Sequence, residues 1–394
     1  MDYLIEAKNI ENYVIESRRY LHQIPELGND LPNTSKFVRE ELKKMGVEVL
    51  ENVGVEHAVV GIIKGKENGK VIALRADMDA LPIKEETGLD FESKNGCMHA
   101  CGHDAHTSIL LGVAKLLSSN KDKIKGTVKL IFQTGEELSI GAKPLVEAGV
   151  LDNPKVDRIY GLHVGSIGKG MSQGQFSVCK GPMMASLDSF KFTVKGKQAH
   201  GAYPQDSVDP TVITSHIILA FQEIISREIA PTEPGLITIG KIEAGKTYNI
   251  IPKEVHVEGT ARGVTHETRE YIAKRMKEMS ESIAKSFRGE ADFEYGWAAP
   301  PLVNDLDSIE FFEKTLNKVL DESAVFEMTT PVMGGEDFAE YLEKVPGAFI
   351  FFYNPMEIDG EIHPHHNPKF ALDEAEFYKA VGVMTAVAVE YLNE

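Results

Sequence analysis

One cysteine and three histidines lie within the short stretch MHACGHDAHTS, residues 98–108. They are His99, Cys101, His103 and His106. Thiolate and imidazole groups bind zinc and similar divalent cations, and a thiolate beside an imidazole can act as a nucleophile. Four chemistries are therefore open: a structural zinc site, a redox thiol, a nucleophilic cysteine and part of a catalytic metal site. The redox chemistry is disfavoured, because Cys97 and Cys101 are four positions apart and do not form a C-x-x-C motif.

Further polar residues stand where predicted strands end. They are Asp77 and Asp79 in segment 70–82, Glu136 and Glu137 at the end of 126–137, His163 in 157–164, and His363, His365 and His366 after 347–355. Ligands bind outside the carboxyl ends of the strands in an open α/β sheet, so these side chains can converge although they span about 290 positions. The chain lacks the paired knuckles of a closed structural zinc site, which favours a catalytic metal site.

The pair Glu136–Glu137 supplies two carboxylates with different directions. Consecutive residues on a strand point to opposite sides. One carboxylate can therefore bind a metal while its neighbour takes a proton from an activated water and passes it to a leaving amine. A solvated pair is the alternative in an acidic chain, and Cys101 alone could be a small buried hydrophobe. No G-x-S-x-G elbow, P-loop or G-x-G-x-x-G loop is present.

Composition excludes several classes of protein. The 394 residues carry 60 acids against 42 bases and a net charge of −18, without a basic block, which argues against a nucleic-acid partner. Three cysteines do not make a disulfide scaffold. No apolar run approaches the roughly 20 residues that span a bilayer, and the charged first residues lack a signal-peptide core. We expect a cytoplasmic protein without a membrane partner.

The order of predicted elements indicates two domains. Strands and helices alternate up to residue 180, which predicts an α/β fold whose mostly parallel central sheet is flanked by helices. Within it, helix 34–45 should have Thr34 or Ser35 as its N-cap and Gly46 as its stop. Strands with alternating polar residues and two long helices, 209–228 and 265–288, predict an inserted α+β domain over 181–296. The first domain then resumes over 297–394.

The set of motifs resembles one family across nearly the whole chain. The segments are RRYLHQIPELG, LRADMDALPI, MHACGHDAHTSILLG, FQTGEEL, GLHV, KGKQAHGAYPQDSVDP, NIIPKEVHVEGTARG, MGGEDF and HHNPKF. They resemble the N-acyl-amino-acid amidohydrolases, which include hippurate hydrolases, auxin-conjugate amidohydrolases and N-acetyl-diaminopimelate deacetylases. These enzymes belong to the aminoacylase and glutamate-carboxypeptidase superfamily of metallohydrolases. The resemblance implies a catalytic domain with two divalent metal ions (Zn, Mn, Co or Ni) and an inserted lid domain that forms a homodimer.

The resemblance also implies roles for residues of the catalytic domain. The implied metal ligands are Cys101, His103, Glu137, His163 and His366. Cys101 would bridge the two ions, which suits a soft thiolate, and Glu136 would be the general base. Asp77 or Asp79 would orient a metal-binding histidine, and His365 could replace His366. His99 and His106 would be bystanders or would orient a ligand.

The inserted domain would complete the site. The resemblance implies that His200 reaches the site of the partner subunit and stabilises the developing oxyanion. Asn249 and Arg262 resemble the pair that grips the substrate α-carboxylate, for which a planar guanidinium is suited. Gly334 would line the acyl pocket. The alternatives are a surface loop histidine for His200 and a surface ion pair for Arg262.

The predicted function is metal-dependent hydrolysis of the amide bond in a small molecule, an N-acyl-L-amino acid. A metallo-dipeptidase or carboxypeptidase of the same superfamily is the second hypothesis. A metal-stabilised binding protein without turnover is the third, although Glu136 beside Glu137 argues against it, because a purely structural site needs no spare base.

Overall fold

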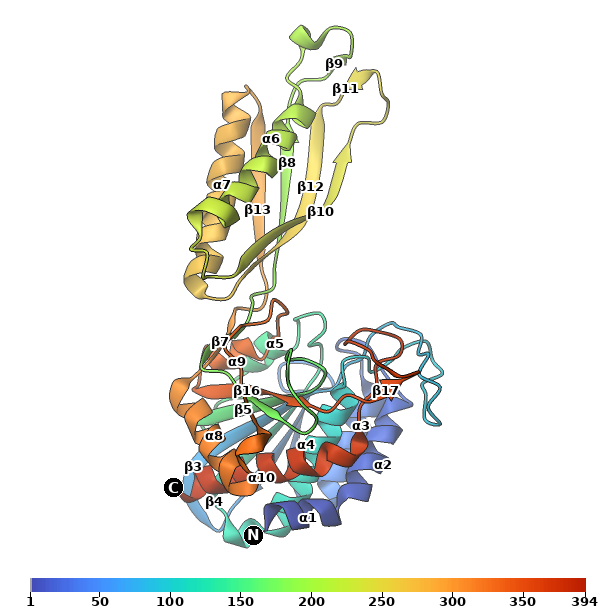
Figure 1. The fold of residues 1–394 in the computed structure, drawn as a ribbon, viewed down its shortest axis with the longest axis vertical. Helices are drawn as coiled ribbons and strands as arrows, with labels where there is room; N and C mark the ends of the chain where they lie inside the picture. The colour runs from blue at the N-terminus through green and yellow to red at the C-terminus, as the bar shows by residue number, and fades with distance from the viewer. Residues whose placement is uncertain (1) are drawn as a thin grey trace. The chain divides into compact units, whose positions relative to one another are not determined.

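The computed structural model describes residues 2–394 and contains two compact units (Figure 1). The first unit comprises the chain up to Gly181 together with Asn304–Thr329 and Asp337–Glu394. The second unit comprises Pro182–Val303 and Thr330–Glu336. The lid and dimerisation role expected for residues 181–296 stays a prediction.

A mixed eight-stranded sheet forms the centre of the first unit. In spatial order its strands are β1 (Glu48–Glu51), β2 (Val59–Lys64), β4 (Lys125–Gln133), β3 (Glu67–Asp77), β5 (Arg158–Gly165), β16 (Gly347–Tyr353), β6 (Phe176–Val178) and β15 (Val325–Glu327). The central strands β4, β3, β5 and β16 run parallel, and β1, β2 and the β16–β6 pair add antiparallel neighbours. This confirms the predicted α/β fold with a mostly parallel sheet.

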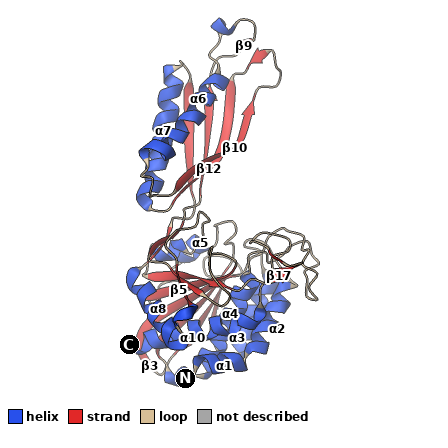
Figure 2. Cartoon of the chain, viewed as in Figure 1, coloured by secondary structure: helices blue, strands red, loops and turns tan. Residues whose placement is uncertain are grey.

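Helices flank this sheet (Figure 2). They are α1 (Tyr3–Asn9), α2 (Glu11–His22), α3 (Pro32–Lys44), α4 (His103–Ser119), α5 (Ala142–Glu147), α8 (Leu306–Val319), α9 (Ala339–Leu342) and α10 (Phe377–Asn393). Almost every residue of α4 and α10 is buried, and the two helices contact each other within one apolar core. A short hairpin of β17 (Glu357–Ile358) and β18 (Glu361–Ile362) follows β16. No helix among residues 2–394 is long and apolar enough to cross a bilayer.

The start of α3 differs from the prediction. Thr34 and Ser35 lie inside the helix, which begins at Pro32, so the predicted cap is wrong. Proline suits the first helical position, because its ring fixes φ and its missing N–H needs no partner there. The carboxylate of Glu26 accepts hydrogen bonds from the amides of Asn33 and Thr34 at 3.1 and 2.9 Å, and it therefore satisfies the free N–H groups that a cap would bind. The helix ends before Gly46, as predicted, with φ of 68° at that glycine.

The second unit is a helix layer on an antiparallel sheet. The sheet order is β10 (Gly235–Ala244), β12 (Glu254–Gly263), β8 (Asp188–Lys195) and β13 (Glu290–Trp297). Helices α6 (Pro210–Glu223) and α7 (His266–Ser286) pack on the sheet through an apolar core. Burial alternates along β8, so that one side of the strand joins this core while Lys191 and Lys195 face out and pair with Glu294 and Asp292.

Short strands complete the second unit. They are β7 (Gly181–Met184), β9 (Ala199–His200), β11 (Ile250–Ile251) and β14 (Leu302–Asn304). The segment NIIPKEVHVEGTARG contributes two strands, β11 and β12, with Pro252 between them. A proline lacks the N–H that a ladder requires, which accounts for the interruption. Strand β11 pairs instead with β9, opposite His200.

Candidate metal centre

The sheet register brings the polar strand ends of the first unit to one level. Asp77 is the last residue of β3 and pairs with Gln133, the last residue of β4. Arg75 of β3 pairs with Gly161 of β5, and the same parallel register sets His163 level with Asp77. Glu136 and Glu137 follow β4 in a turn. The clustering therefore follows from parallel strands that end together.

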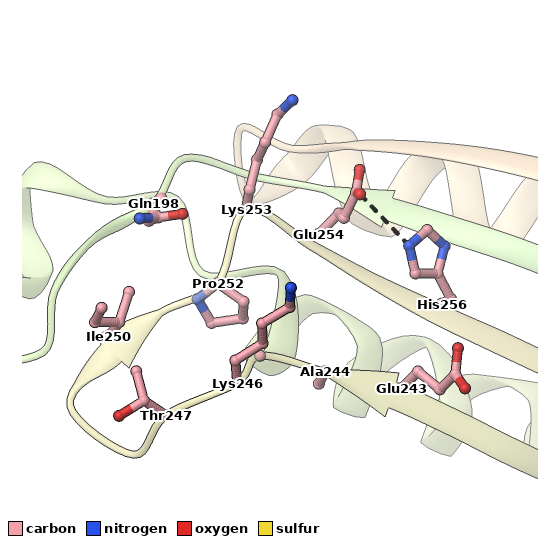
Figure 3. Close-up of a pocket in the computed structure, with 11 residues that line it drawn as sticks. Gln198, Glu243, Ala244, Lys246, Thr247, Ile250, Pro252, Lys253, Glu254 and His256 are labelled. Atoms are coloured by element: carbon pink, nitrogen blue, oxygen red, sulfur yellow. Dashed lines mark ion pairs between the residues drawn. The ribbon is translucent and has the colours of Figure 1, made fainter.

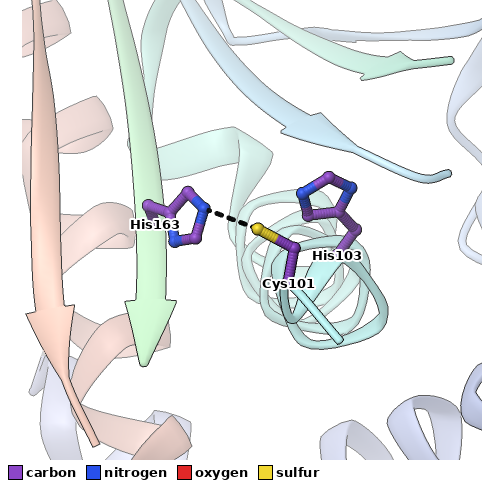
Figure 4. Close-up of side chains that lie close together, drawn as sticks. All are labelled: Cys101, His103 and His163. Carbon is purple, nitrogen blue, oxygen red and sulfur yellow. Dashed lines mark hydrogen bonds between the residues drawn. The ribbon is translucent and has the colours of Figure 1, made fainter. Parts of the chain in front are cut away.

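Gly102 determines where the Cys101 thiol and the His103 imidazole lie. It has φ of 88°, and α4 begins at the next residue, His103. A Cβ at position 102 would lie 2.8 Å from Cγ2 of Val164. Glycine therefore permits both the left-handed turn and the close approach of the 98–102 loop to β5. The Cys101 thiol points towards His163 of β5 as a result, and the His103 ring lies on the other side of that thiol (Figure 4).

Two groups of potential ligands share one thiol. The ligand atoms of Cys101, His103 and His163 lie within 4.8 Å of one another, and Sγ of Cys101 is 3.5 Å from Nε2 of His163 (Figure 4). The atoms of Cys101, Glu137 and His366 form a second such group, in which Nε2 of His366 is 3.3 Å from the Glu137 carboxylate. The structure thus brings together all five side chains that the resemblance implied as ligands.

The first unit also brings the spare carboxylate to this cluster. His103, Glu136 and Glu137 form a third group within the same distance limit. The expectation that the two glutamates alternate along a strand is wrong, because β4 ends at Gln133 and both residues lie in the turn that follows. The turn, and not strand alternation, directs both carboxylates towards His103, at 4.0 and 3.9 Å from its Nε2.

Unsatisfied buried atoms test whether cations fit here. Both ring nitrogens of His103 and Oε1 of Glu137 are buried without a hydrogen-bond partner. A buried polar atom without a partner is costly, and native proteins rarely tolerate several together. Thiolate, imidazole and carboxylate together suit zinc and the neighbouring divalent metals. The donor set and its unsatisfied atoms therefore fit divalent cations.

The pKa values around the thiol show what cation binding would release. Burial, together with the Glu137 carboxylate, raises the pKa of the Cys101 thiol well above its usual range. Burial also raises the pKa of Glu137. For His103, burial opposes protonation, but the carboxylates of Asp77 and Asp79 together with Cys101 outweigh it, and the pKa is raised. Metals bind the deprotonated forms, so cation binding should release protons from this cluster.

Asp77 and Asp79 have different neighbours. Asp79 lies 3.4 Å from Nδ1 of His103, and its two carboxylate oxygens accept the backbone N–H groups of Glu136 and Glu137 at 3.1 Å. Asp77 instead contacts His106 at 2.5 Å and accepts a hydrogen bond from Arg75 at 2.8 Å. Of the two acids, the geometry favours Asp79 as the one that orients His103, because it lies at the ring nitrogen remote from the glutamates.

The two adjacent histidines near the C-terminus also separate. His366 has φ of 65° and directs its ring towards Glu137. His365 donates from Nε2 to the carbonyl of Val164 at 3.0 Å and belongs to none of the ligand groups. His99 is buried with neither ring nitrogen hydrogen-bonded, and it too lies outside the ligand groups. The structure therefore favours His366 over His365 as a ligand.

The other four predicted site residues belong to the second unit. His200 ends β9, is exposed and accepts a hydrogen bond from the amide of Ala202 at 3.1 Å. Asn249 lies beside it, since its carbonyl accepts the amide of Gly201 at 2.8 Å. Arg262 of β12 is partly buried, and its buried Nη1 has no hydrogen-bond partner.

Gly334 has a backbone contact of its own in that unit. Its carbonyl accepts the amide of Ala185 at 3.0 Å. An open hollow of about 480 Å³, with Gln198, Lys246 and His256 among its lining residues, lies in the same unit and includes none of the predicted site residues (Figure 3).

Sequence reasoning missed a buried ionic network behind the cluster. Arg75 donates to Asp77 at 2.8 Å and to Asp337 at 2.9 Å, and the carboxylate of Asp337 also accepts from Gln133 at 2.7 Å. All of these side chains are buried. A readable signal was the charged Arg75 inside the apolar run VIALRAD, because a fully buried arginine needs a paired carboxylate.

Comparison with known proteins places the chain in a family. The profile of peptidase family M20/M25/M40 matches residues 73–390. Thermostable carboxypeptidase 1 of Saccharolobus solfataricus is 41% identical over 99% of this chain and 98% of its own. N-acetyl-L-cysteine deacetylase of Bacillus subtilis is 39% identical over 95% of this chain and 87% of its own.

A solved structure supports the same assignment. The crystal structure of the YXEP protein of Bacillus subtilis, described as a dinuclear metal binding peptidase from the M20 family, has a TM-score of 0.84 and 34% identity. The match covers 98% of this chain and 99% of that one. The chain therefore belongs to peptidase family M20/M25/M40, in agreement with the resemblance seen in its motifs, and it is a metal-dependent amide hydrolase.

Proposed function

We propose that the cluster binds two divalent cations and that the protein hydrolyses the amide bond of N-acyl-L-amino acids, releasing a carboxylic acid and a free amino acid. The observation that carries the proposal is a thiol shared by two ligand groups with a further carboxylate, Glu136, beside them. Two similar proteins support it: the YXEP protein is described as a dinuclear metal binding peptidase, and a 39% identical relative is an N-acetyl-L-cysteine deacetylase.

Each ligand has a proposed place in one of two sites. His103 and His163 would hold one cation and Glu137 and His366 the other, and Cys101, which belongs to both ligand groups, would serve both cations. When bound, the cations act as Lewis acids that activate water and polarise the scissile carbonyl. Cys101 and Glu137, whose pKa values are raised by burial, would bind cations in their deprotonated forms. Asp79 keeps His103 and the turn at residues 136–137 in register.

Glu136 is the proposed general base. Its carboxylate lies beside His103 and Glu137, next to the proposed cation sites. The residue is largely buried, with 8% of its surface exposed. It takes a proton from the attacking water and delivers it to the departing amine.

The second unit supplies the proposed substrate contacts. Arg262 binds the substrate α-carboxylate together with Asn249, and Gly334 lines the acyl pocket. The partly buried Arg262, whose Nη1 has no hydrogen-bond partner, supports this role because a guanidinium binds carboxylate through two parallel hydrogen bonds. His200 stabilises the developing negative charge on the carbonyl oxygen, and it does so in a homodimer.

Carboxypeptidase or dipeptidase activity is the second candidate. A specific observation favours it, because a relative with 41% identity over almost the full length of both chains is a thermostable carboxypeptidase. Both activities cleave an amide next to a free α-carboxylate, so the same ligands and base would serve either substrate. They differ in the group on the acyl side, which is a simple acid in one case and an amino acid or peptide in the other.

A substrate panel tests the proposal. The protein is stripped with a chelator, reloaded separately with Zn²⁺, Mn²⁺, Co²⁺ and Ni²⁺, and assayed on N-acetyl and N-benzoyl amino acids and on dipeptides. We expect cation-dependent release of free amino acid, with higher kcat/KM for acyl amino acids than for dipeptides. Faster dipeptide turnover would establish the second candidate instead. No turnover with any cation would favour a metal-stabilised binding protein.

A further inference from the structure

The backbone N–H and carbonyl of Val164 lie among three histidines. Its N–H donates to Nε2 of His106 at 2.9 Å. Its carbonyl accepts from Nδ1 of His163 at 2.9 Å and from Nε2 of His365 at 3.0 Å. Val164 is in β5, directly after His163. Both backbone polar groups of Val164 are therefore engaged by imidazoles, and one of the imidazoles is a proposed metal ligand.

These hydrogen bonds determine the tautomer of His163. A carbonyl can only accept, so Nδ1 of His163 carries the proton that it donates to Val164. Its Nε2 is left with a lone pair, and that nitrogen faces Sγ of Cys101 at 3.5 Å. This is the tautomer that a metal requires, with the second nitrogen fixed by a hydrogen bond. The direction of the Val164 carbonyl therefore sets the direction of the ligand lone pair.

His106 holds the backbone N–H of the same residue, Val164. Because its Nε2 accepts from the Val164 N–H, its neutral ring carries the proton on Nδ1 and donates it to Asp77. Asp77 is in turn paired with Arg75, which is paired with Asp337. The N–H of Val164 is thus connected to a chain of buried groups, all of them within the first unit.

A glycine of β5, Gly165, leaves room for the imidazole of His365. Gly165 has φ of 117°, and a Cβ at this position would lie 2.3 Å from Nε2 of His365. Glycine leaves the space that the imidazole needs to reach the Val164 carbonyl. The ring of His365 also contacts Phe370 at 4.6 Å and His163 at 5.1 Å between centroids. These contacts fix the donor in place.

We propose that His106 and His365 are positioning residues for His163: His106 holds the N–H and His365 the carbonyl of Val164, on the two peptide groups that flank this residue, and together they aim Nε2 of His163 at one of the two cation sites. The inference rests on the proposed metal centre. It predicts that loss of the His365 donor weakens the cation site containing His163 and leaves the site formed by Glu137 and His366 unchanged.

Two variants at position 365 test the proposal, with a third as the control. His365→Phe keeps an aromatic ring but removes the donor, and His365→Gln keeps an N–H group near the same position. His363→Phe is the matched control, because His363 is close in sequence but contacts the carbonyl of Ile358 and no group of this network. His106→Leu is less informative, since it would leave both Asp77 and the Val164 N–H unpaired in the core.

Calorimetric titration of the metal-free proteins with Zn²⁺ measures each site separately. In the wild type we expect two bound ions per chain. His365→Phe should weaken one of them by about 10- to 100-fold and change the other by no more than about twofold. His365→Gln should recover most of the lost affinity, and His363→Phe should behave as the wild type. Ring-nitrogen NMR of His163 should show its Nδ1–H tautomer weakened only in His365→Phe.

The outcomes separate this inference from the proposed function. Equal weakening of both sites in His365→Phe, or unchanged binding at both, would overturn the positioning role while leaving the metal centre intact. Failure of His365→Gln to recover affinity would also overturn it, because the lost contact would then be packing and not a hydrogen bond. A wild type that binds no Zn²⁺ would overturn the metal centre and this inference together.

Discussion

Two buried ionic clusters, one in each unit, differ in how completely they are satisfied. In the second unit, the carboxylate of Asp188 accepts two hydrogen bonds from Arg269, at 2.8 and 2.7 Å, and one from Tyr295 at 3.1 Å. In the first unit, the ring nitrogens of His103 and Oε1 of Glu137 are buried and have no hydrogen-bond partner. Both clusters are buried, yet only the first-unit cluster is left with unsatisfied atoms.

The difference separates a structural role from a chemical one. A buried ion pair whose polar atoms are all engaged can stabilise a fold without a further partner. A cluster of thiol, imidazole and carboxylate with open positions costs folding energy unless something else binds to it. Burial and charge are common to both clusters, so the metal centre is distinguished by unsatisfied atoms that belong to side chains converging on one thiol. Substitutions in the first-unit cluster should therefore lower activity or metal content, whereas substitutions in the Asp188 cluster should lower the stability of the fold.

The largest effect is expected at Glu136. Glu136→Gln should lower kcat by about 10²- to 10⁴-fold, because it removes the proposed general base, while the bound metal per chain stays as in the wild type. The matched variant Glu137→Gln removes a proposed ligand and should lower the metal content. Kinetics and metal analysis of the same preparations measure both. Substantial activity in Glu136→Gln would eliminate this residue as the base.

At Asp188 we expect a loss of stability and no loss of bound metal. Asp188→Asn leaves the buried guanidinium of Arg269 without its counter-charge, which should lower the free energy of unfolding by about 3–5 kcal/mol. Denaturant unfolding measures this change. Metal content should be unaltered where the variant remains folded. Loss of bound metal without loss of stability would show that the two clusters do not differ in the way inferred here.

A smaller, pH-dependent effect on stability is expected at His22, which is buried in the first unit. Its Nε2 is hydrogen-bonded to the Glu85 carboxylate at 3.0 Å and its Nδ1 to the Asp104 carboxylate at 2.7 Å. Burial and Arg18 oppose its protonation, but the two carboxylates outweigh them and raise its pKa. A raised pKa means that the charged ring adds stability below the unfolded value of about 6.5, and that this stability is lost as pH rises through the folded pKa.

The variant His22→Gln should therefore be less stable than the wild type at pH 6, with the deficit shrinking as the pH rises. Urea unfolding of both metal-free proteins across a pH series gives the deficit directly. A deficit that grows towards alkaline pH would contradict the sign of this pKa shift. A deficit independent of pH would show that His22 acts through packing alone.

Part of the fold and the site could be predicted because it depends on local pattern. The apolar runs gave the parallel strands, and the polar residues at their ends gave the candidate ligands. Long-range geometry was not readable in the same way. The N–H groups at the start of α3 are satisfied by Glu26, an acid before the helix, and no local rule distinguishes that contact from a Thr34 or Ser35 cap.

The neighbouring histidines show the same limit. The motif HHNPKF offers two candidate ligands, and the structure favours His366 through its left-handed backbone and the contact of His365 with Val164. Asp77 and Asp79 could not be separated either, because the contacts that distinguish them come from distant parts of the chain: Asp77 contacts His106 of α4, and Asp79 accepts the backbone N–H groups of the turn at 136–137. The roles of His200, Asn249, Arg262 and Gly334, and the dimer, stay predictions.

The proposed metal centre depends on the Cys101 thiol that two ligand groups share. Metal stoichiometry tests this role of Cys101 most directly. Wild type, Cys101→Ala and the matched control Cys97→Ala, whose thiol belongs to none of the ligand groups, are reconstituted with Zn²⁺, desalted and analysed for bound metal. We expect two ions per chain in wild type and Cys97→Ala, and loss of at least one in Cys101→Ala. Two firmly bound ions in Cys101→Ala would contradict this role.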